Sequence, residues 1–140
     1  MTGPCRQPGG VPGWVREMMR GAVNSRLEAV VRLRVRDPGG VESHVDAVVD
    51  TGFTSSLTLS PAVANALGLA RQSGGSAMLA DGSIRPFDIF AAEVDWDGAW
   101  RPVMAWVVGD ETLLGMGLLA GNQLRVNAVL SGLVEITSIS

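Results

Sequence analysis

An acidic residue, a hydroxyl residue and a glycine follow one another directly after an apolar run near the middle of the chain. They are Asp50-Thr51-Gly52, at the end of Ala47-Val48-Val49. A carboxylate beside a buried strand is disfavoured by desolvation unless hydrogen-bond donors, a partner group or water stabilise its charge. Gly52 has no Cβ to crowd a tight turn, and the Thr51 hydroxyl can bond locally or across an interface. Such a carboxyl group can serve as a general acid or base. The alternative is an Asx-turn residue that only bonds its own backbone.

The motif occurs once. Two other Asp-Gly pairs, Asp81-Gly82 and Asp97-Gly98, lack the hydroxyl residue between Asp and Gly, and neither follows an apolar strand of the same kind. A reaction that needs two such carboxylates must therefore take the second one from another molecule.

Length and composition fit one globular domain. The chain has 140 residues, of which 46% are hydrophobic, and its mean hydropathy is +0.25. These values are sufficient for a packed core. The net charge of −3 and the pI near 5.0 provide no general attraction to nucleic acid or to anionic membranes. Cys5 is the only cysteine, so no disulfide can form within the chain. There is no apolar stretch of membrane-spanning length and no secretory signal, and we expect a cytoplasmic protein.

The N-terminal region differs from the rest. Residues 1–19 are rich in Gly and Pro without hydrophobic periodicity and predict a flexible leader, so that residues 20–140 form the domain. From Arg26 to Arg36 apolar residues alternate with mostly charged ones, starting at Leu27, which predicts a half-buried strand. The turn at 37–40 and a second alternating run to Val49 complete a hairpin.

Further strands dominate the remainder of the chain. Ser60, Pro61 and Gly68 have the positions of an N-cap, a first helical residue and a C-terminal stop, and predict a short helix. A hairpin with its tip at Asp81-Gly82 is expected. The strands predicted after this tip span residues 84–96, 100–108, 124–129 and 132–139, with a short helical piece after Gly115. Many short strands with one or two brief helices predict an all-β fold, a closed or partly closed barrel.

Other chemical groups have simpler interpretations. His44 lies in step with charged residues on the polar face of its strand, and no His or Cys cluster exists to complete a zinc site, so we expect no metal. The arginine stripe of Arg32, Arg34 and Arg36 is interpreted as a solvated strand face, and we expect no nucleic-acid partner.

The order of these parts resembles that of the single-lobe, retropepsin-like aspartic peptidases, which include the retroviral proteases and a group of small bacterial and archaeal relatives. The resemblance rests on Asp50-Thr51-Gly52, a hairpin centred on Asp81-Gly82, and the late Leu113-Leu114-Gly115, and it covers residues 20–138. The run from Asp50 to Leu59 looks closest to the bacterial group. The fold that it implies is the closed, six-stranded acid-protease barrel.

The resemblance also implies roles for particular residues. Asp50 corresponds to the catalytic carboxylate, Thr51 to the hydroxyl that braces two paired loops across a two-fold axis, and Gly52 to the backbone amide that contacts the carboxylates. Leu113, Leu114 and Gly115 correspond to the hydrophobic strand behind the loop, with Gly115 permitting close approach. The flap corresponds to Met78–Phe87.

A substrate-binding region follows from the same resemblance. An extended peptide is expected to lie beneath the flap, whose residues Ala80, Asp81 and Gly82 contact it. Its side chains are expected to enter apolar pockets lined by Leu57, Leu79 and Ile84.

The resulting hypothesis is a homodimeric aspartic endopeptidase that needs no cofactor. The Asp50 carboxylates of two subunits share one proton and activate water for attack on a peptide bond. The alternating C-terminal strand, residues 132–139, is expected to pair with its counterpart across the dimer. The alternative is a module of the same fold that only dimerises or binds peptides.

Overall fold

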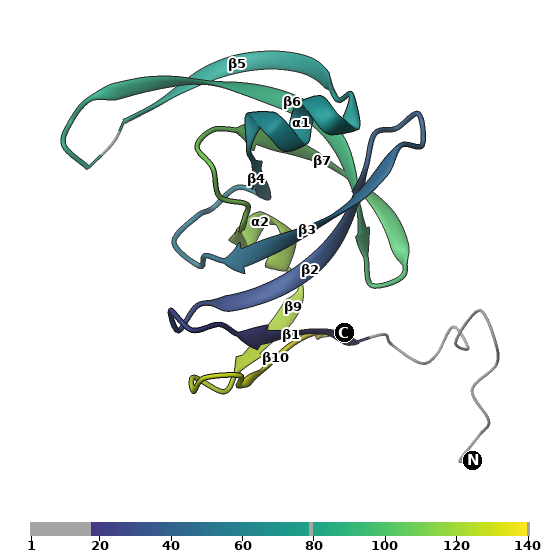
Figure 1. Ribbon diagram of the computed structural model, residues 1–140, viewed down its shortest axis with the longest axis vertical. Helices are drawn as coiled ribbons and strands as arrows, with labels where there is room; N and C mark the ends of the chain where they lie inside the picture. The colour runs from purple at the N-terminus through teal and green to yellow at the C-terminus, as the bar shows by residue number, and fades with distance from the viewer. Residues whose placement is uncertain (1–17, 79, 140) are drawn as a thin grey trace.

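The computed structural model describes residues 18–78 and 80–139 (Figure 1). The predicted leader up to residue 17 and Leu79 of the predicted pocket lie outside these residues. The strands are β1 (Met18–Val23), β2 (Ala29–Arg36), β3 (Glu42–Val49), β4 (Leu57–Leu59), β5 (Ala70–Met78), β6 (Ile84–Trp96), β7 (Ala99–Val107), β8 (Leu113–Leu114), β9 (Asn122–Val126) and β10 (Leu133–Ser138), and the helices are α1 (Pro61–Leu67) and α2 (Met116–Leu119).

Within the described residues, six strands close into a ring. Strand pairing runs from β6 through β7, β4, β8, β3 and β2, and β2 pairs with β6 again at Val35 and Arg36. The predicted all-β, closed six-stranded fold is therefore confirmed. The ring is uneven, because β6 and β7 pair over the length of a long hairpin whereas β4 meets β8 only at Leu57 and Leu114.

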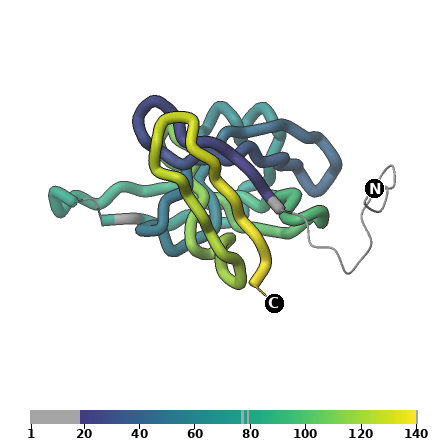
Figure 2. Tube along the Cα trace, turned by 90° about the horizontal axis from the view of Figure 1, so that it is seen from below, coloured from purple at the N-terminus to yellow at the C-terminus, as the bar shows by residue number. Residues whose placement is uncertain are grey.

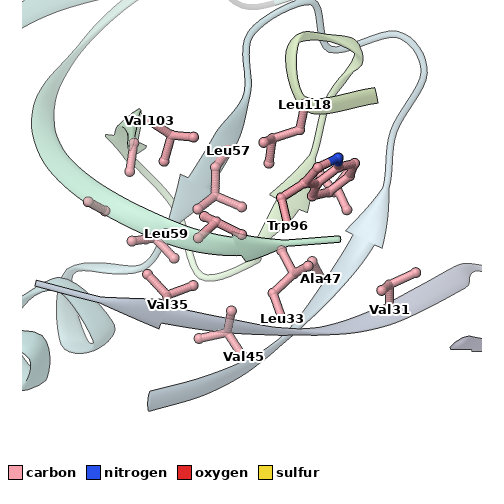
Figure 3. Close-up of a cluster of buried hydrophobic side chains, with 14 of the residues drawn as sticks. Val31, Leu33, Val35, Val45, Ala47, Leu57, Leu59, Trp96, Val103 and Leu118 are labelled. Atoms are coloured by element: carbon pink, nitrogen blue, oxygen red, sulfur yellow. The ribbon is translucent and has the colours of Figure 1, made fainter. Parts of the chain in front are cut away.

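The core fills this ring. Side chains from opposite sides of it, among them Leu33, Leu59 and Leu118, point toward one another in Figure 3 and are almost entirely buried. Alternation explains the inward set on β2, where every second residue from Val31 to Val35 is buried. Burial of this apolar surface stabilises the ring that holds the loop after β3.

Local signals in the sequence located several elements. Ser60 caps α1, because its hydroxyl accepts a hydrogen bond from the Val63 N–H at 3.2 Å, and Gly68 ends the helix with a φ of 66°. The predicted strand over residues 84–96 is β6. The predicted hairpin tip is also confirmed, with Gly82 at a φ of 87°.

The N-terminal boundary was predicted too far along the chain. Met18 and Met19, assigned to the leader, begin β1, which pairs with both β2 and β10. Leu27 was predicted to be an inward strand residue but lies in the turn between β1 and β2, with a φ of 61°. The turn forms because the Asn24 side chain accepts hydrogen bonds from the backbone N–H groups of Arg26 and Glu28.

The prediction for the C-terminal strand was wrong in one respect. β10 lies between β1 and β9 and pairs with both, so neither of its edges is free to pair with another subunit. Figure 2 shows β1 and the β9–β10 hairpin side by side on the underside of the ring. In the described part of the chain, the strand that ends this side of the sheet is β9.

The arginine stripe on β2 is neutralised by neighbouring carboxylates. Arg32 lies 3.6 Å from Asp46, Arg34 lies 3.1 Å from Asp95, and Arg36 donates to Glu93 at 2.7 Å. Arg36 also stacks over the Trp100 ring at 4.1 Å.

Candidate active site

Asp50 immediately follows β3, where the chain leaves the ring in a tight turn. Its N–H donates to the Leu114 carbonyl at 2.9 Å, and its own carbonyl accepts the Phe53 N–H at 3.1 Å. The side chain is half-buried, and its Oδ1 atom accepts the Gly52 N–H at 2.9 Å. No described residue donates to Oδ2. The turn therefore fixes one carboxylate oxygen and leaves the other available to a ligand or a second carboxylate.

The neighbouring residues of the turn face outward. Thr51 and Gly52 are both exposed. A Cβ on Gly52 would lie 3.3 Å from Oδ1 of Asp50, so the glycine keeps space beside the carboxylate. Because Thr51 is exposed, its hydroxyl can reach a group outside this chain. Its role in bracing two loops stays a prediction.

The segment predicted to lie behind the turn does so. β8 is parallel to β3, with Val48 opposite Leu113 and Val49 opposite Leu114. Gly115 continues from β8 against the turn, and its N–H donates to the Ser56 carbonyl at 3.0 Å. A Cβ on Gly115 would lie 2.6 Å from the Phe53 ring and would also collide with the Ser55 carbonyl. Only glycine permits this approach.

Two further supports of the turn were not predicted. Thr58 is buried, and its hydroxyl donates to the Glu111 carbonyl at 3.0 Å and accepts the Leu113 N–H at 2.8 Å, which ties β4 to the start of β8. Arg101 on β7 donates to the carbonyls of Gly117 and Leu118 at the end of α2. Thr58 lies in the run from Asp50 to Leu59 that carries the resemblance but was given no role, and Arg101 stands in no motif.

The hairpin of β5 and β6 extends beyond the ring on the same side as the Asp50 turn (Figure 1). Ala80, Asp81 and Gly82 lie at its tip, and the side chain of Ile84 is 66% exposed. These predicted substrate-binding residues are thus accessible. The Ser83 hydroxyl and then the Ser83 N–H, both donating to Asp81, hold the pKa of this carboxyl below its usual value.

Three half-buried aromatic rings connect the Asp50 turn to this hairpin. Phe53 meets Trp106 edge-on with 5.2 Å between ring centroids, and Phe87 stacks on Trp106 at 4.4 Å. The Phe87 ring also lies against Gly75, where an added Cβ would lie 2.9 Å from it. These ring contacts were not predicted: Phe87 was named only as the last residue of the flap, and Phe53, which directly follows the motif, was given no role.

Leu57 does not belong to a surface pocket. It is fully buried inside the ring, between β7 and β8, and is one of the core side chains in Figure 3. The prediction failed because β4 is enclosed on both faces, so that all three of its residues are buried. Leu57 supports the turn from within and offers no surface to a substrate.

Among residues 18–78 and 80–139, no three His, Cys, Asp or Glu side chains lie close enough together to hold a metal ion. No helix in the same part of the chain is long and apolar enough to cross a membrane.

Comparison with known proteins places the chain in a family. The model of the family described as aspartyl protease matches residues 31–122, well over half of the chain, so the chain belongs to that family. The fold is similar to the crystal structure of a retropepsin-like aspartic protease from Rickettsia conorii, with a TM-score of 0.55 and 19% sequence identity. That match covers 91% of this chain and 97% of the Rickettsia chain. No match was found among curated proteins.

Proposed function

We propose that the chain is a homodimeric aspartic endopeptidase whose active site forms between two Asp50 carboxylates, one from each subunit. The observation that supports this proposal best is the arrangement at Asp50. The turn presents a half-buried carboxylate with one oxygen fixed by the Gly52 N–H and the other free of donors from the described residues. Family membership points to the same reaction class, hydrolysis of a peptide bond.

The two carboxylates must share a proton. At a separation of about 4 Å and an effective dielectric of about 20, two full negative charges repel each other by about 4 kcal/mol. One proton therefore remains between them over a broad pH range, and the pair titrates in two macroscopic steps. One Asp50 is then ionised while the other is protonated, which supplies a base and an acid in one site.

Each carboxyl group has a defined part in the reaction. The ionised Asp50 takes a proton from a water molecule as the water oxygen attacks the peptide carbonyl carbon, and the protonated Asp50 donates to the carbonyl oxygen. The tetrahedral intermediate then collapses and the C–N bond breaks. The Asp50 that took the proton from water gives it to the leaving nitrogen, and a hydroxyl group of the intermediate returns a proton to the other Asp50. Residues 113–115 keep the turn rigid, and the β5–β6 hairpin covers an extended substrate and excludes water.

The second candidate is a module that binds peptides or dimerises without catalysis. It is favoured by the hydrogen bond from Gly52 to Asp50, because an Asx turn makes this bond whether or not the carboxylate reacts. The two candidates differ in one measurable property, the cleavage of peptides.

A mixed peptide library incubated between about pH 4 and 7 with the wild type and with Asp50→Asn distinguishes them. Cleavage by the wild type that is lost in Asp50→Asn is the expected result. The substitution retains an oxygen for the Gly52 N–H but cannot take or give the proton. Cleavage unaffected by the substitution excludes the mechanism, and a wild type that binds library peptides without cleaving them supports the module.

A further inference from the structure

The connection between β7 and β8 carries two adjacent acidic residues, Asp110 and Glu111. Both are exposed, and neither carboxylate forms an ion pair with a residue that the structure describes. Carboxylates on the strands of the ring differ in this respect, since those of Asp46, Glu93 and Asp95 each bind an arginine. The carboxylates of Asp110 and Glu111 are therefore available to a cation from another molecule.

Hydrogen bonds fix this connection beside the Asp50 turn. The Thr112 carbonyl accepts the Val48 N–H at 2.9 Å, and the Leu114 carbonyl accepts the Asp50 N–H at 2.9 Å. Glu111 precedes Leu114 by three residues, which is about 10 Å along an extended strand. Figure 1 shows the connection on the same side of the ring as the Asp50 turn and beneath the projecting β5–β6 hairpin. A peptide bound at Asp50 thus has side chains within reach of Glu111.

The backbone that carries the two carboxylates is held by the ring. The hydroxyl of buried Thr58 donates to the Glu111 carbonyl at 3.0 Å, and the Val108 N–H donates to the Leu59 carbonyl at 3.2 Å. Both ends of the connection are therefore attached to β4. A carboxylate on an anchored backbone loses less conformational freedom on binding a ligand than one on a free loop.

The other charges on this side of the molecule leave it acidic. Asp81, whose pKa lies below its usual value, is exposed at the hairpin tip. On the projecting part of the hairpin, Arg71 is neutralised by Asp88 at 2.8 Å. Arg85 is exposed there and has no ion pair with a described residue. Around the proposed site, one such guanidinium thus stands against three exposed carboxylates besides Asp50.

From this distribution of charge we infer that the proposed peptidase prefers substrates with a lysine or arginine close to the cleaved bond, and that Asp110 and Glu111 are specificity-determining residues that bind this cationic side chain. The inference rests on the proposed function, because it names the substrate class of the same site. Carboxylates form charge-assisted hydrogen bonds with ammonium and guanidinium groups and repel acidic side chains. Since both subunits of a two-fold site contribute the connection, a basic residue is favoured within about three positions on either side of the bond.

A double variant that removes both charges tests the inference. Asp110→Asn with Glu111→Gln keeps the size of the two side chains but not their charge. The matched control is Asp37→Asn with Glu42→Gln, which removes two carboxylates near the start of β3, at the opposite end of this strand from Asp50. Circular dichroism verifies that every variant is folded.

The first measurement is cleavage of a mixed peptide library, with the cleaved bonds identified by mass spectrometry. For the wild type and the control, lysine and arginine are expected to be enriched by more than about threefold within three positions of the cleaved bond. This enrichment is expected to disappear in the Asp110→Asn, Glu111→Gln variant.

The second measurement is binding without cleavage, in protein that carries Asp50→Asn. The probes are two labelled apolar peptides that differ only in carrying lysine or glutamate near their centre, and fluorescence anisotropy gives the dissociation constants. The lysine peptide is expected to bind more than about tenfold more tightly. Adding Asp110→Asn and Glu111→Gln to the same protein should remove this difference.

The outcomes separate this inference from the proposed function. Cleavage by the wild type without enrichment of basic residues, or an enrichment that the double variant retains, overturns the inference, and the proposed function stands if the cleavage depends on Asp50. If the wild type cleaves no peptide, the catalytic proposal fails and binding decides. A preference for the lysine peptide that is lost with the two carboxylates then supports the inference, and equal binding of the two peptides overturns it.

Discussion

The ring of Phe87, on the hairpin strand β6, stacks on Trp106 of β7 with 4.4 Å between centroids and 19° between planes. Trp106 in turn touches Phe53, three residues after Asp50. The strand that reaches over the site and the turn that holds the carboxylate are therefore packed against one side chain. Aromatic pairs in such geometry are worth about 0.5–1.5 kcal/mol beyond the area that they bury.

Removal of this shared ring is expected to affect both stability and substrate binding. Trp106→Ala should lower the free energy of unfolding by about 2 kcal/mol, less than for a fully buried tryptophan because Trp106 is half-exposed. It should also raise KM for a cleaved peptide more than it lowers kcat, because the hairpin loses its support. Urea denaturation and steady-state kinetics measure these effects, with Trp106→Phe as the control that keeps an aromatic ring. Equal urea midpoints for Trp106→Ala and the wild type would contradict a structural role for the Trp106 ring.

A substitution at Gly115 tests whether the backbone after β8 must lie this close to the Asp50 turn. Gly115→Ala introduces a methyl group against the Phe53 ring and the Ser55 carbonyl, and it should lower the free energy of unfolding by about 1–3 kcal/mol. The control is Gly39→Ala, whose methyl group meets only the side-chain carboxylate of Asp37, which can move aside and lose no more than its hydrogen bond with the Gly39 N–H. Denaturation curves for both variants should separate clearly. Similar small losses in the two would mean that the turn can shift to make room.

A shared site predicts dominance of an inactive subunit. When Asp50→Asn subunits are mixed with an equal amount of wild type and allowed to exchange, random pairing leaves peptide cleavage at about half its starting rate. Higher ratios should depress it further, because every mixed dimer lacks one reacting carboxylate. The control is the same mixture assayed before the subunits have exchanged, which should leave the rate unaltered. A rate independent of added Asp50→Asn would show that each chain works alone.

The lowered pKa of Asp81 leads us to expect that the hairpin tip keeps its hydrogen bonds in mild acid. Hydrogen bonds from the Ser83 hydroxyl and N–H favour the ionised form and hold the pKa of Asp81 below its usual value. Their contribution is therefore fully present above the unfolded pKa of about 3.9 and is lost as pH falls through the lower folded pKa. Titration by NMR should find this low pKa, and Ser83→Ala should raise it. The tip should keep its structure between about pH 4 and 7, the range of the cleavage assay. A wild-type Asp81 whose pKa is not lowered would contradict this expectation.

Features encoded by neighbouring residues were predicted well from the sequence. Ser60 and Gly68 delimit α1 because capping and the left-handed stop depend on local backbone chemistry. The Asp81-Gly82 tip and the extent of β6 follow from turn chemistry and β-propensity in the same way. The proximity of Asp50 to residues 113–115 came from the family resemblance, since nothing local to either segment specifies it.

The errors arose where distant parts of the chain decide the structure. β1 is short and carries no clear alternation, and it is fixed by pairing with β10 from the far end of the chain. Leu27 and Val129 were both assigned to strands because they are apolar, yet both lie in connections. Hydrophobic patterning identifies apolar residues but not whether they pack inside the ring or stay exposed in a connection, as Leu27 and Val129 do. The contact of Trp106 with Phe53 and Phe87 depends on the closed ring and could not be read from spacing.

The 13-residue strand β6 has two different halves. Its C-terminal half is clamped in the ring, where Val94 is fully buried and Glu93 binds Arg36. Its N-terminal half projects with most side chains in water, and the paired strand β5 shifts register between Arg71 and Ser73. The hairpin is therefore fixed to the ring at one end, projects from it at the other, and has an irregular strand pairing between the two. We therefore expect the tip to move more readily than the ring, so that binding of an extended peptide, as proposed, would not require the barrel to open.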